Sequence, residues 1–292
     1  MNLLSFFNLF CCAGCRPSRM ITQCAFFPPR PASYKIIEHG QKKNKCILKM
    51  NQKKHAIISR NVFWTTNCKG NKIACIMIPH NEAVFTIIYS HGNGCDMGQS
   101  LATFMDLSAR LKCNVLLYDY SGYGSSTGRA SEANLYWDIE AVYHTLRLKY
   151  NINCDQIILY GQSIGSVPTV YLASRVNVAG VILHCALLSA LRVVFPNFRK
   201  SLWFDGLKNI DKLPKIKSPV LVIHGTRDEI VDFSHGMTIY ESCPNVVEPL
   251  WVPGAGHNNI EMFEQYLTRL DKFINEELMQ RYQQRQRCSE SS

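Results

Sequence analysis

The residues best suited to chemistry lie in the run Gly161-Gln162-Ser163-Ile164-Gly165, which fits the pattern G-x-S-x-G. A β-branched apolar run ends just before it, and a helical pattern with Pro168 in its first turn follows. Glycines on either side relieve a turn that is too tight for side chains, so Ser163 is exposed at a helix N-terminus. The helix dipole and free N–H groups there favour developing negative charge. We therefore predict a nucleophilic serine; the alternative is a turn serine without chemistry.

A serine hydroxyl is a weak nucleophile and needs a base within hydrogen-bond distance. His257 follows the last predicted strand in the glycine-rich run Pro253–Asn258, and Asp228 follows the end of an earlier strand. A histidine can take the serine proton near neutral pH and return it to the leaving group. An aspartate beside it fixes the tautomer and stabilises the imidazolium. The three residue types together predict a Ser163–His257–Asp228 triad.

Other side chains compete for two of these roles. Glu229 and Asp232 are alternative acids, but Asp228 lies closest to the strand end. Four histidines are alternative bases, and three of them end predicted strands, where packing or structural roles are common. They are His91, His184, His224 and His235. Only His257 follows the last strand in a glycine-rich turn, which favours it.

The oxyanion of an acyl-transfer reaction needs N–H donors. In this motif the first donor is the N–H that follows the nucleophile, here that of Ile164, and the second comes from the loop after the first parallel strand. That loop reads His91-Gly92-Asn93-Gly94. We select the N–H of Asn93, with that of Gly94 as the alternative. The chemistry calls for no metal and no organic cofactor.

The elements that position these residues are predicted from hydrophobic periodicity. The runs 57–64 and 72–78 indicate a hairpin, and apolar strands then alternate with helices up to residue 278. Unbroken apolar strands separated by helices indicate a parallel sheet covered on both faces. Together with the chain order Ser, acid, His, this predicts an α/β-hydrolase fold with a mostly parallel central sheet and no large lid domain. The expected strands are Val84–Tyr89, Asn114–Tyr120, Gln156–Tyr160, Gly180–His184, Pro219–His224 and Val247–Val252, and the expected helices are Gly98–Leu111, Glu132–Lys149, Ser166–Ala173 and Ile260–Leu278.

Charge and composition exclude some classes of protein. No apolar stretch is long enough for a transmembrane helix. The net charge is +10, yet no nucleic-acid recognition motif accompanies it, so attraction to anionic lipid is the better interpretation. The 13 cysteines are scattered through predicted strands, helices and loops, unlike a disulfide framework, which indicates a reducing compartment.

The N-terminus has an aromatic, apolar run that ends in a cysteine cluster, without the basic start of a secretory signal. This pattern predicts S-acylation of Cys11, Cys12 and Cys15 and peripheral membrane attachment, with a disordered tail as the alternative. We expect residues 1–55 to form the acylated, basic extension, residues 56–280 the hydrolase domain and residues 281–292 a basic polar tail.

Beyond the fold, the chain resembles the α/β-hydrolase domain-containing protein 17 family of membrane-associated depalmitoylases. The resemblance rests on the N-terminal cysteine cluster and on the runs Phe26–Pro29, Ser90–Asn93, Tyr118–Gly124, Tyr160–Gly165, Ile223–Asp228, Asp232–Gly236 and Glu248–Asn258. Gly94 and Arg227 depart from the family pattern, which bears on substrate preference. The resemblance implies hydrolysis of S-palmitoyl thioesters on membrane proteins at the cytoplasmic face of plasma and endosomal membranes.

Two rival functions stay open at this point. One is a general carboxylesterase or lipase with the same triad, and the other is a membrane-tethered binding scaffold, because a fold does not fix a function. The apolar segment from Leu187 to Phe204 is expected either to line an acyl groove or to form ordinary core helices.

Overall fold

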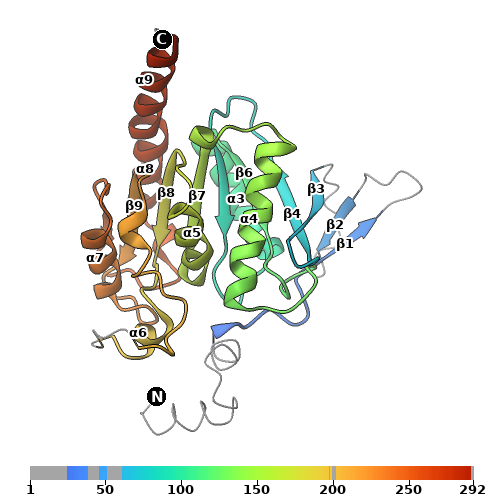
Figure 1. The fold of residues 1–292 in the computed structure, drawn as a ribbon, viewed down its shortest axis with the longest axis horizontal. Helices are drawn as coiled ribbons and strands as arrows, with labels where there is room; N and C mark the ends of the chain where they lie inside the picture. Colours follow the sequence, from blue (N-terminus) through green and yellow to red (C-terminus); the bar gives the residue numbers. More distant parts are fainter. Residues whose placement is uncertain (1–24, 39–45, 51–60, 197, 199–201, 291–292) are drawn as a thin grey trace, which may run out of the picture.

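A computed structural model describes residues 25–38, 46–50, 61–196, 198 and 202–290. Its centre is an eight-stranded sheet with the order β10-β9-β8-β7-β5-β6-β4-β3 (Figure 1). The strands are β3 (Val62–Thr66), β4 (Lys72–Ile78), β5 (Thr86–Ser90), β6 (Asn114–Tyr118), β7 (Ile157–Gln162), β8 (Gly180–His184), β9 (Val220–Gly225) and β10 (Leu250–Val252). Pairing is parallel from β10 through β6 and antiparallel where β4 meets β6 and β3. The predicted hairpin and mostly parallel sheet are confirmed.

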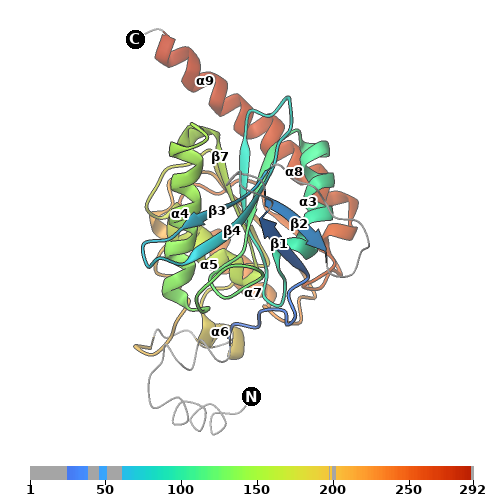
Figure 2. The same cartoon turned by 90° about the vertical axis from the view of Figure 1, so that its right-hand side faces the viewer.

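Helices cover both faces of this sheet, as Figures 1 and 2 show. One face packs against α4 (Glu132–Leu148), α5 (Ser166–Ala173) and α7 (Phe233–Ser242). The other packs against α3 (Met97–Leu111) and α8 (Glu264–Asp271). Every residue of β5, β8 and β9 is therefore buried, which explains why these strands are continuous apolar runs rather than alternating ones.

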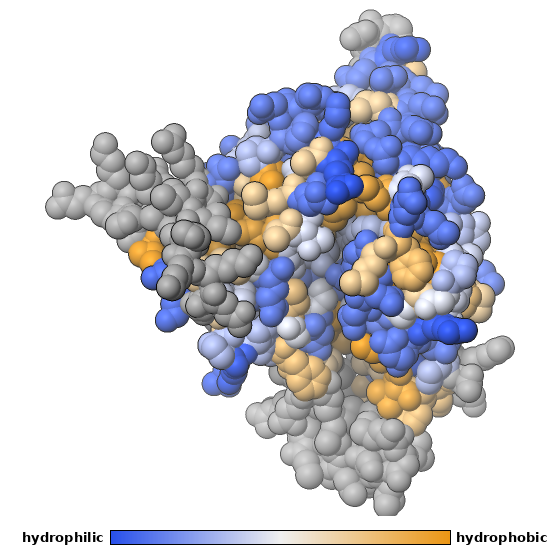
Figure 3. All heavy atoms as spheres, turned by 180° about the vertical axis from the view of Figure 1, so that it is seen from behind, coloured by the Kyte–Doolittle hydropathy of each residue, from blue (hydrophilic) through white to orange (hydrophobic). Residues whose placement is uncertain are grey.

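Two segments form secondary structure that we did not predict in detail from the sequence. β1 (Tyr34–Glu38) and β2 (Cys46–Met50) pair antiparallel as a separate two-stranded sheet. Within the expected polar tail, residues up to Glu290 are helical: α9 (Met279–Glu290) continues the chain after a π-helical stretch, Lys272–Leu278. Its Gln, Arg and Met residues favour helix and extend one already nucleated, so no apolar face is required. In Figure 3 this end of the molecule is covered by hydrophilic side chains.

The end of the sheet that matters for chemistry is the one at which the parallel strands terminate. The short helix α6 (Ala190–Val194) lies there, after β8, and the described chain begins at the same end (Figure 1). None of the helices in the described ranges has both the length and the apolar character needed to cross a bilayer.

A buried carboxyl group braces the loop after β6. Asp138 of α4 accepts hydrogen bonds from the backbone N of Ser121 at 2.7 Å, from its Oγ at 2.9 Å and from Asn67 Nδ2 at 2.7 Å. Burial raises the pKa of Asp138 to about 6, although the bonds from Ser121 and Asn67 act in the opposite direction.

A raised pKa predicts a stability that falls as pH increases. The folded state holds the Asp138 proton more tightly than the unfolded chain, so this stabilisation is complete below the ordinary aspartate pKa and is lost as pH rises through about 6. We expect the free energy of unfolding of wild type, relative to Asp138→Asn, to fall between pH 4 and 6 by up to about 3 kcal/mol, at about 1.4 kcal/mol per pKa unit. Urea unfolding of both proteins across this range measures the difference. A difference that does not change with pH would contradict the assignment.

Candidate active site

The turn that carries Ser163 leaves no room for side chains beside it. Ser163 has a φ of 53°, in the left-handed region that few non-glycine residues adopt. A Cβ added to Gly161 would lie 2.5 Å from the Gly165 carbonyl oxygen, and one added to Gly165 would lie 2.0 Å from the Ser90 carbonyl oxygen. Both glycines are thus required by close backbone contacts, and the strained turn presents the serine between β7 and α5.

A chain of hydrogen bonds joins the three residues predicted to act together. His257 Nε2 lies 3.0 Å from Ser163 Oγ, and His257 Nδ1 lies 2.7 Å from Asp228 Oδ2. The residues come from the ends of three strands: Ser163 follows β7, Asp228 follows β9 and His257 follows β10. The distances suit a histidine that donates Nδ1–H to the carboxylate and accepts the serine proton at Nε2.

The carboxylate of Asp228 is buried but well supplied with donors. Its Oδ1 accepts from the backbone N atoms of Ile230 at 2.9 Å and Val231 at 2.8 Å. His224 Nε2 lies 3.2 Å from Oδ2 and 2.8 Å from the Val231 carbonyl. Burial raises the pKa of Asp228, but the hydrogen bonds from His224 and His257 outweigh it and hold this pKa well below its usual value. The carboxylate is therefore ionised at neutral pH.

The alternative acids have other roles. Asp232 caps α7, where its Oδ1 accepts from Ser234 N at 2.9 Å. Glu229 Oε2 accepts from the backbone N of His257 at 3.2 Å, so it steadies the histidine loop rather than the imidazole. Asp228 is the acid whose carboxylate meets the His257 ring.

The alternative bases are buried against other partners. His184 Nδ1 lies 2.9 Å from Tyr160 Oη, and burial lowers the pKa of His184 to about 3. His235 contacts Leu188 N and the Arg192 carbonyl, each at 3.1 Å, and burial lowers its pKa to about 4. His91 is buried beside Asp119.

The contact between His224 and Asp228 was not predicted from the sequence. His224 was expected to be a packed strand-end residue, and its ring is indeed fully buried, yet it also contacts the acid. The available signal was the spacing of four residues to Asp228 across a strand-to-loop turn, which brings the two side chains together. Few patterns in one sequence distinguish such a neighbour from a core histidine.

The predicted oxyanion loop lies beside the nucleophile. A Cβ added to Gly92 would lie 3.9 Å from Ser163 Cβ, so the loop after β5 passes along the serine side chain. The side chain of Asn93 faces elsewhere: its Oδ1 accepts from Tyr123 Oη at 2.8 Å and its Nδ2 donates to the Ala25 carbonyl. The roles of the Ile164 and Asn93 N–H groups as oxyanion donors stay predictions.

The remaining predicted site residues are the cysteines. Cys11, Cys12 and Cys15 lie outside the described residues. Cys185 Sγ comes close to Asp228 and His257, with ligand atoms of the three residues within 4.8 Å of one another. Burial raises the pKa of the Cys185 thiol, so it is a poor metal ligand, and the other two groups are already bonded to each other. The arrangement is therefore better explained by the hydrogen bond between His257 and Asp228 than by a metal centre.

Comparison with known proteins gives both family and fold relatives. A protein-family model described as Chlamydia CHLPS protein (DUF818) matches residues 43–178. Alpha/beta hydrolase domain-containing protein 17C of Mus musculus is 44% identical over 303 residues, covering 92% of this chain and 93% of that relative. Protein 17B of Homo sapiens is 46% identical over 288 residues, covering 96% and 99%.

Solved structures with this fold are more distant in sequence. The Pyrococcus furiosus esterase Pf2001 aligns with a TM-score of 0.64 at 20% identity, covering 86% of this chain and 97% of the esterase. The esterase RhEst1 from Rhodococcus aligns with a TM-score of 0.58 at 20% identity, covering 74% and 99%. These similarities confirm the predicted α/β-hydrolase fold.

The geometry predicts which acid matters for activity. Asp228→Asn should lower kcat by about 10⁴-fold, the size of effect known for this change in a serine protease triad, because an amide neither fixes the tautomer nor stabilises the imidazolium. Asp232→Asn is the matched control and should stay within about twofold, since Asn caps helices as well as Asp. Initial rates on a water-soluble short-chain thioester, with Ser163→Ala as background, measure both. Greater loss in the Asp232 variant would show that the wrong acid was assigned.

Proposed function

The chain belongs to the α/β-hydrolase domain-containing protein 17 family, and we propose that it is a palmitoyl-protein thioesterase. It would remove S-palmitoyl groups from membrane-associated proteins at the cytoplasmic face of the plasma membrane and of endosomal membranes. The observation that carries the proposal is the unbroken hydrogen-bond chain from Ser163 through His257 to the ionised Asp228.

Each residue has one task in the proposed reaction. His257 takes the hydroxyl proton as Ser163 Oγ attacks the acyl carbon, and Asp228 stabilises the imidazolium. The N–H groups of Ile164 and Asn93 are the proposed donors to the oxyanion. The cysteine thiolate, whose conjugate thiol has a pKa of about 8.5, leaves readily and takes the proton from His257, which restores the neutral imidazole. His257 then activates a water molecule that hydrolyses the acyl-serine and restores the enzyme.

The place where the N-terminal end of the described chain joins the domain supports a membrane-bound substrate. Ala25, the first described residue, contacts Asn93 in the loop beside Ser163. Ala25 follows Cys15, a proposed acylation site, by ten residues. A chain of that length spans at most about 35 Å, so an anchor there would keep the site close to the lipid surface.

Apolar side chains surround the same end of the sheet. Trp203 and Met262 are 77% and 86% exposed, and they lie on segments that follow the ends of β8 and β10. The space-filling view shows apolar side chains at this lower end, as well as across the middle of the same face (Figure 3). Exposed aromatic and apolar groups suit contact with lipid tails or an acyl chain.

The apolar segment after β8 is the proposed acyl contact. It begins beside the nucleophile turn, where Leu187 N donates to Ser166 Oγ at 3.4 Å and Ser166 Oγ donates to the Ser163 carbonyl at 2.6 Å. Leu187 and Leu188 are buried, whereas Val194 is 38% exposed. The segment thus runs from the core beside the serine to the surface, and its apolar side chains are the proposed contact for the acyl chain.

Polar substitutions in this segment test the acyl contact. Phe195→Ser and Trp203→Ser should lower kcat/KM for a palmitoyl thioester by about tenfold more than for a butyryl thioester, because burying each CH₂ group contributes about 0.8 kcal/mol. Leu148→Ser is the control, since Leu148 is 84% exposed at the end of α4 that lies away from the site. Equal losses on both chain lengths would sink the acyl-contact hypothesis.

The reaction itself is tested by palmitate release. The full chain, bound to vesicles that contain anionic lipid, should release palmitate from an S-palmitoylated peptide, and Ser163→Ala should abolish the release. Cleavage of simple oxyesters without turnover of the thioester would favour a general esterase. Binding of the peptide without hydrolysis of either substrate would favour a tethered scaffold.

A further inference from the structure

The start of the described chain, which we call the N-terminal segment (Ala25–Tyr34), is hydrogen-bonded to the oxyanion loop (His91–Cys95). Asn93 makes the contact with its side chain, since Nδ2 donates to the Ala25 carbonyl at 2.8 Å and Oδ1 accepts from Phe27 N at 2.9 Å. The same Oδ1 accepts from Gly94 N at 3.0 Å, within the loop. One amide therefore links the segment to the loop and shapes the loop as well.

A second set of contacts ties the segment to the start of α3, directly after the loop. Asp96, the N-cap of α3, accepts from Ser33 N at 2.7 Å and from Ser33 Oγ. Tyr34 Oη donates to Asp119, whose other carboxylate oxygen accepts from Met97 N at 2.7 Å. Because these carboxylates are fully buried, each hydrogen bond donated to them offsets part of the free-energy cost of burying their charge.

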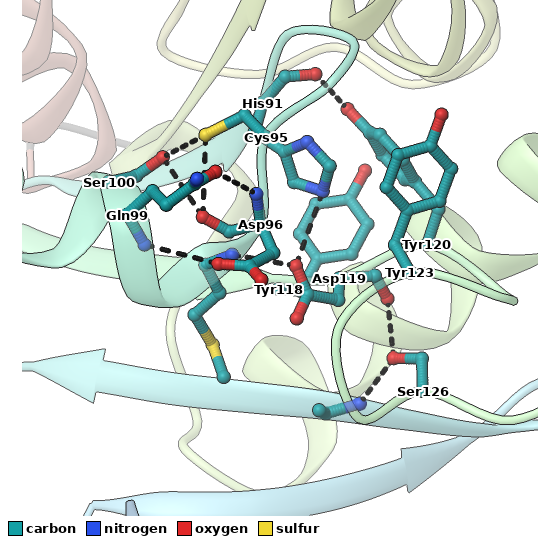
Figure 4. Close-up of polar contacts among 12 residues, drawn as sticks. His91, Cys95, Asp96, Gln99, Ser100, Tyr118, Asp119, Tyr120, Tyr123 and Ser126 are labelled. Carbon is teal, nitrogen blue, oxygen red and sulfur yellow. Dashed lines mark hydrogen bonds and ion pairs between the residues drawn. The ribbon is translucent and has the colours of Figure 1, made fainter. Parts of the chain in front are cut away.

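Asp119 also contacts the first residue of the loop. His91 Nε2 lies 3.3 Å from Asp119 Oδ1, and Tyr120 Oη donates to the His91 carbonyl at 2.6 Å. Figure 4 shows His91 directed at Asp119, with Asp96 and the start of α3 beside them. Both ends of the oxyanion loop are thus held by buried carboxylates that the N-terminal segment also binds.

Glycines leave the space that the segment occupies. A Cβ on Gly98 would lie 2.5 Å from Ser33 Oγ, and one on Gly124 would lie 2.7 Å from Tyr34 Oη. Phe26 and Tyr34 are buried in the hydrophobic core, so the segment is fixed at both ends of this stretch. The fit is that of a built-in part of the domain, not of a tail lying on its surface.

We propose that the N-terminal segment is a positioning element that holds the oxyanion loop against Ser163, and that the Asn93 side chain is its main contact. The inference rests on the proposed function, because it concerns the loop expected to stabilise the oxyanion. The loop is confined on its other side by the close approach of Gly165 to the backbone of Ser90 and His91. Loosening the segment should therefore let the loop move on the side that the segment holds.

The sharpest test removes one N–H donor outside the catalytic machinery. Phe27→Pro deletes the donor to Asn93 Oδ1, while Phe27→Ala removes the exposed ring and keeps the donor. Phe27 precedes Pro28 and is already restricted to extended conformations that proline tolerates. Asn93→Ala removes the contact from the loop side, and Asn245→Ala, which loses a single bond to the Lys217 carbonyl, is its control.

We expect Phe27→Pro and Asn93→Ala in the full chain to lower kcat on a soluble thioester by about tenfold or more, less than the 10²–10³ that follows complete loss of an oxyanion donor. KM should change little in both variants, because the affected interaction forms only in the transition state. The melting temperature of Phe27→Pro should change little, because that variant loses one exposed hydrogen bond. Phe27→Ala and Asn245→Ala should remain within about twofold. Amide hydrogen exchange at residues 92–95 should rise in Phe27→Pro relative to Phe27→Ala.

Each outcome decides the inference. Unchanged kcat in folded Phe27→Pro, or a change in KM alone, would overturn it, and so would faster loop exchange without loss of kcat. If a lower melting temperature shows that Asn93→Ala loses kcat because it is less stable, the comparison of Phe27→Pro with Phe27→Ala decides. If wild type shows no turnover that depends on Ser163, the proposed function has failed, whereas the exchange data still show whether the segment holds the loop.

Discussion

The site depends on a contact between two backbones. β5 and β7 are parallel neighbours in the sheet, with Ser90 paired to Gly161, and Gly165 approaches the Ser90 carbonyl too closely for any side chain. Because both segments are fixed there, the sheet sets where the oxyanion loop starts relative to the nucleophile turn. Strain at Ser163, with its positive φ, is tolerated because the surrounding strands determine the conformation on every side.

A second constraint is the buried charge of Asp228. Burial alone would favour the protonated carboxyl group, and a neutral group could not stabilise an imidazolium. The bonds from His224, His257 and the backbone of Val231 reverse this preference. His224 belongs to β9, so the carboxylate orients the catalytic histidine while remaining attached to the rigid sheet. Asp228 lies on a loop, but its contact with His224 fixes its position relative to a strand.

The sequence predicted the features that are local or periodic. Continuous apolar runs marked the parallel strands, and the G-x-S-x-G run with its flanking strand and helix placed Ser163 at a strand end. The missed features join residues far apart in the chain: 66 positions separate Phe27 from Asn93, and 85 separate Tyr34 from Asp119. No periodicity encodes which polar groups will meet once the sheet has assembled. Folding also buries Phe26 and Tyr34, near the two ends of the N-terminal segment.

Under the proposed function, these long-range contacts link the membrane anchor to the candidate active site. An anchor attached by a flexible linker to a remote surface would bring the domain to the membrane without orienting it. Here the described chain enters the fold beside Ser163 and is hydrogen-bonded there to the loop that passes it. Under the proposed function, the residues between Cys15 and Ala25 limit the distance to the lipid, and the segment that follows them, Ala25–Tyr34, holds the oxyanion loop. Substrate access and transition-state stabilisation would then depend on one short stretch of chain, whose buried phenylalanine and tyrosine keep it in place.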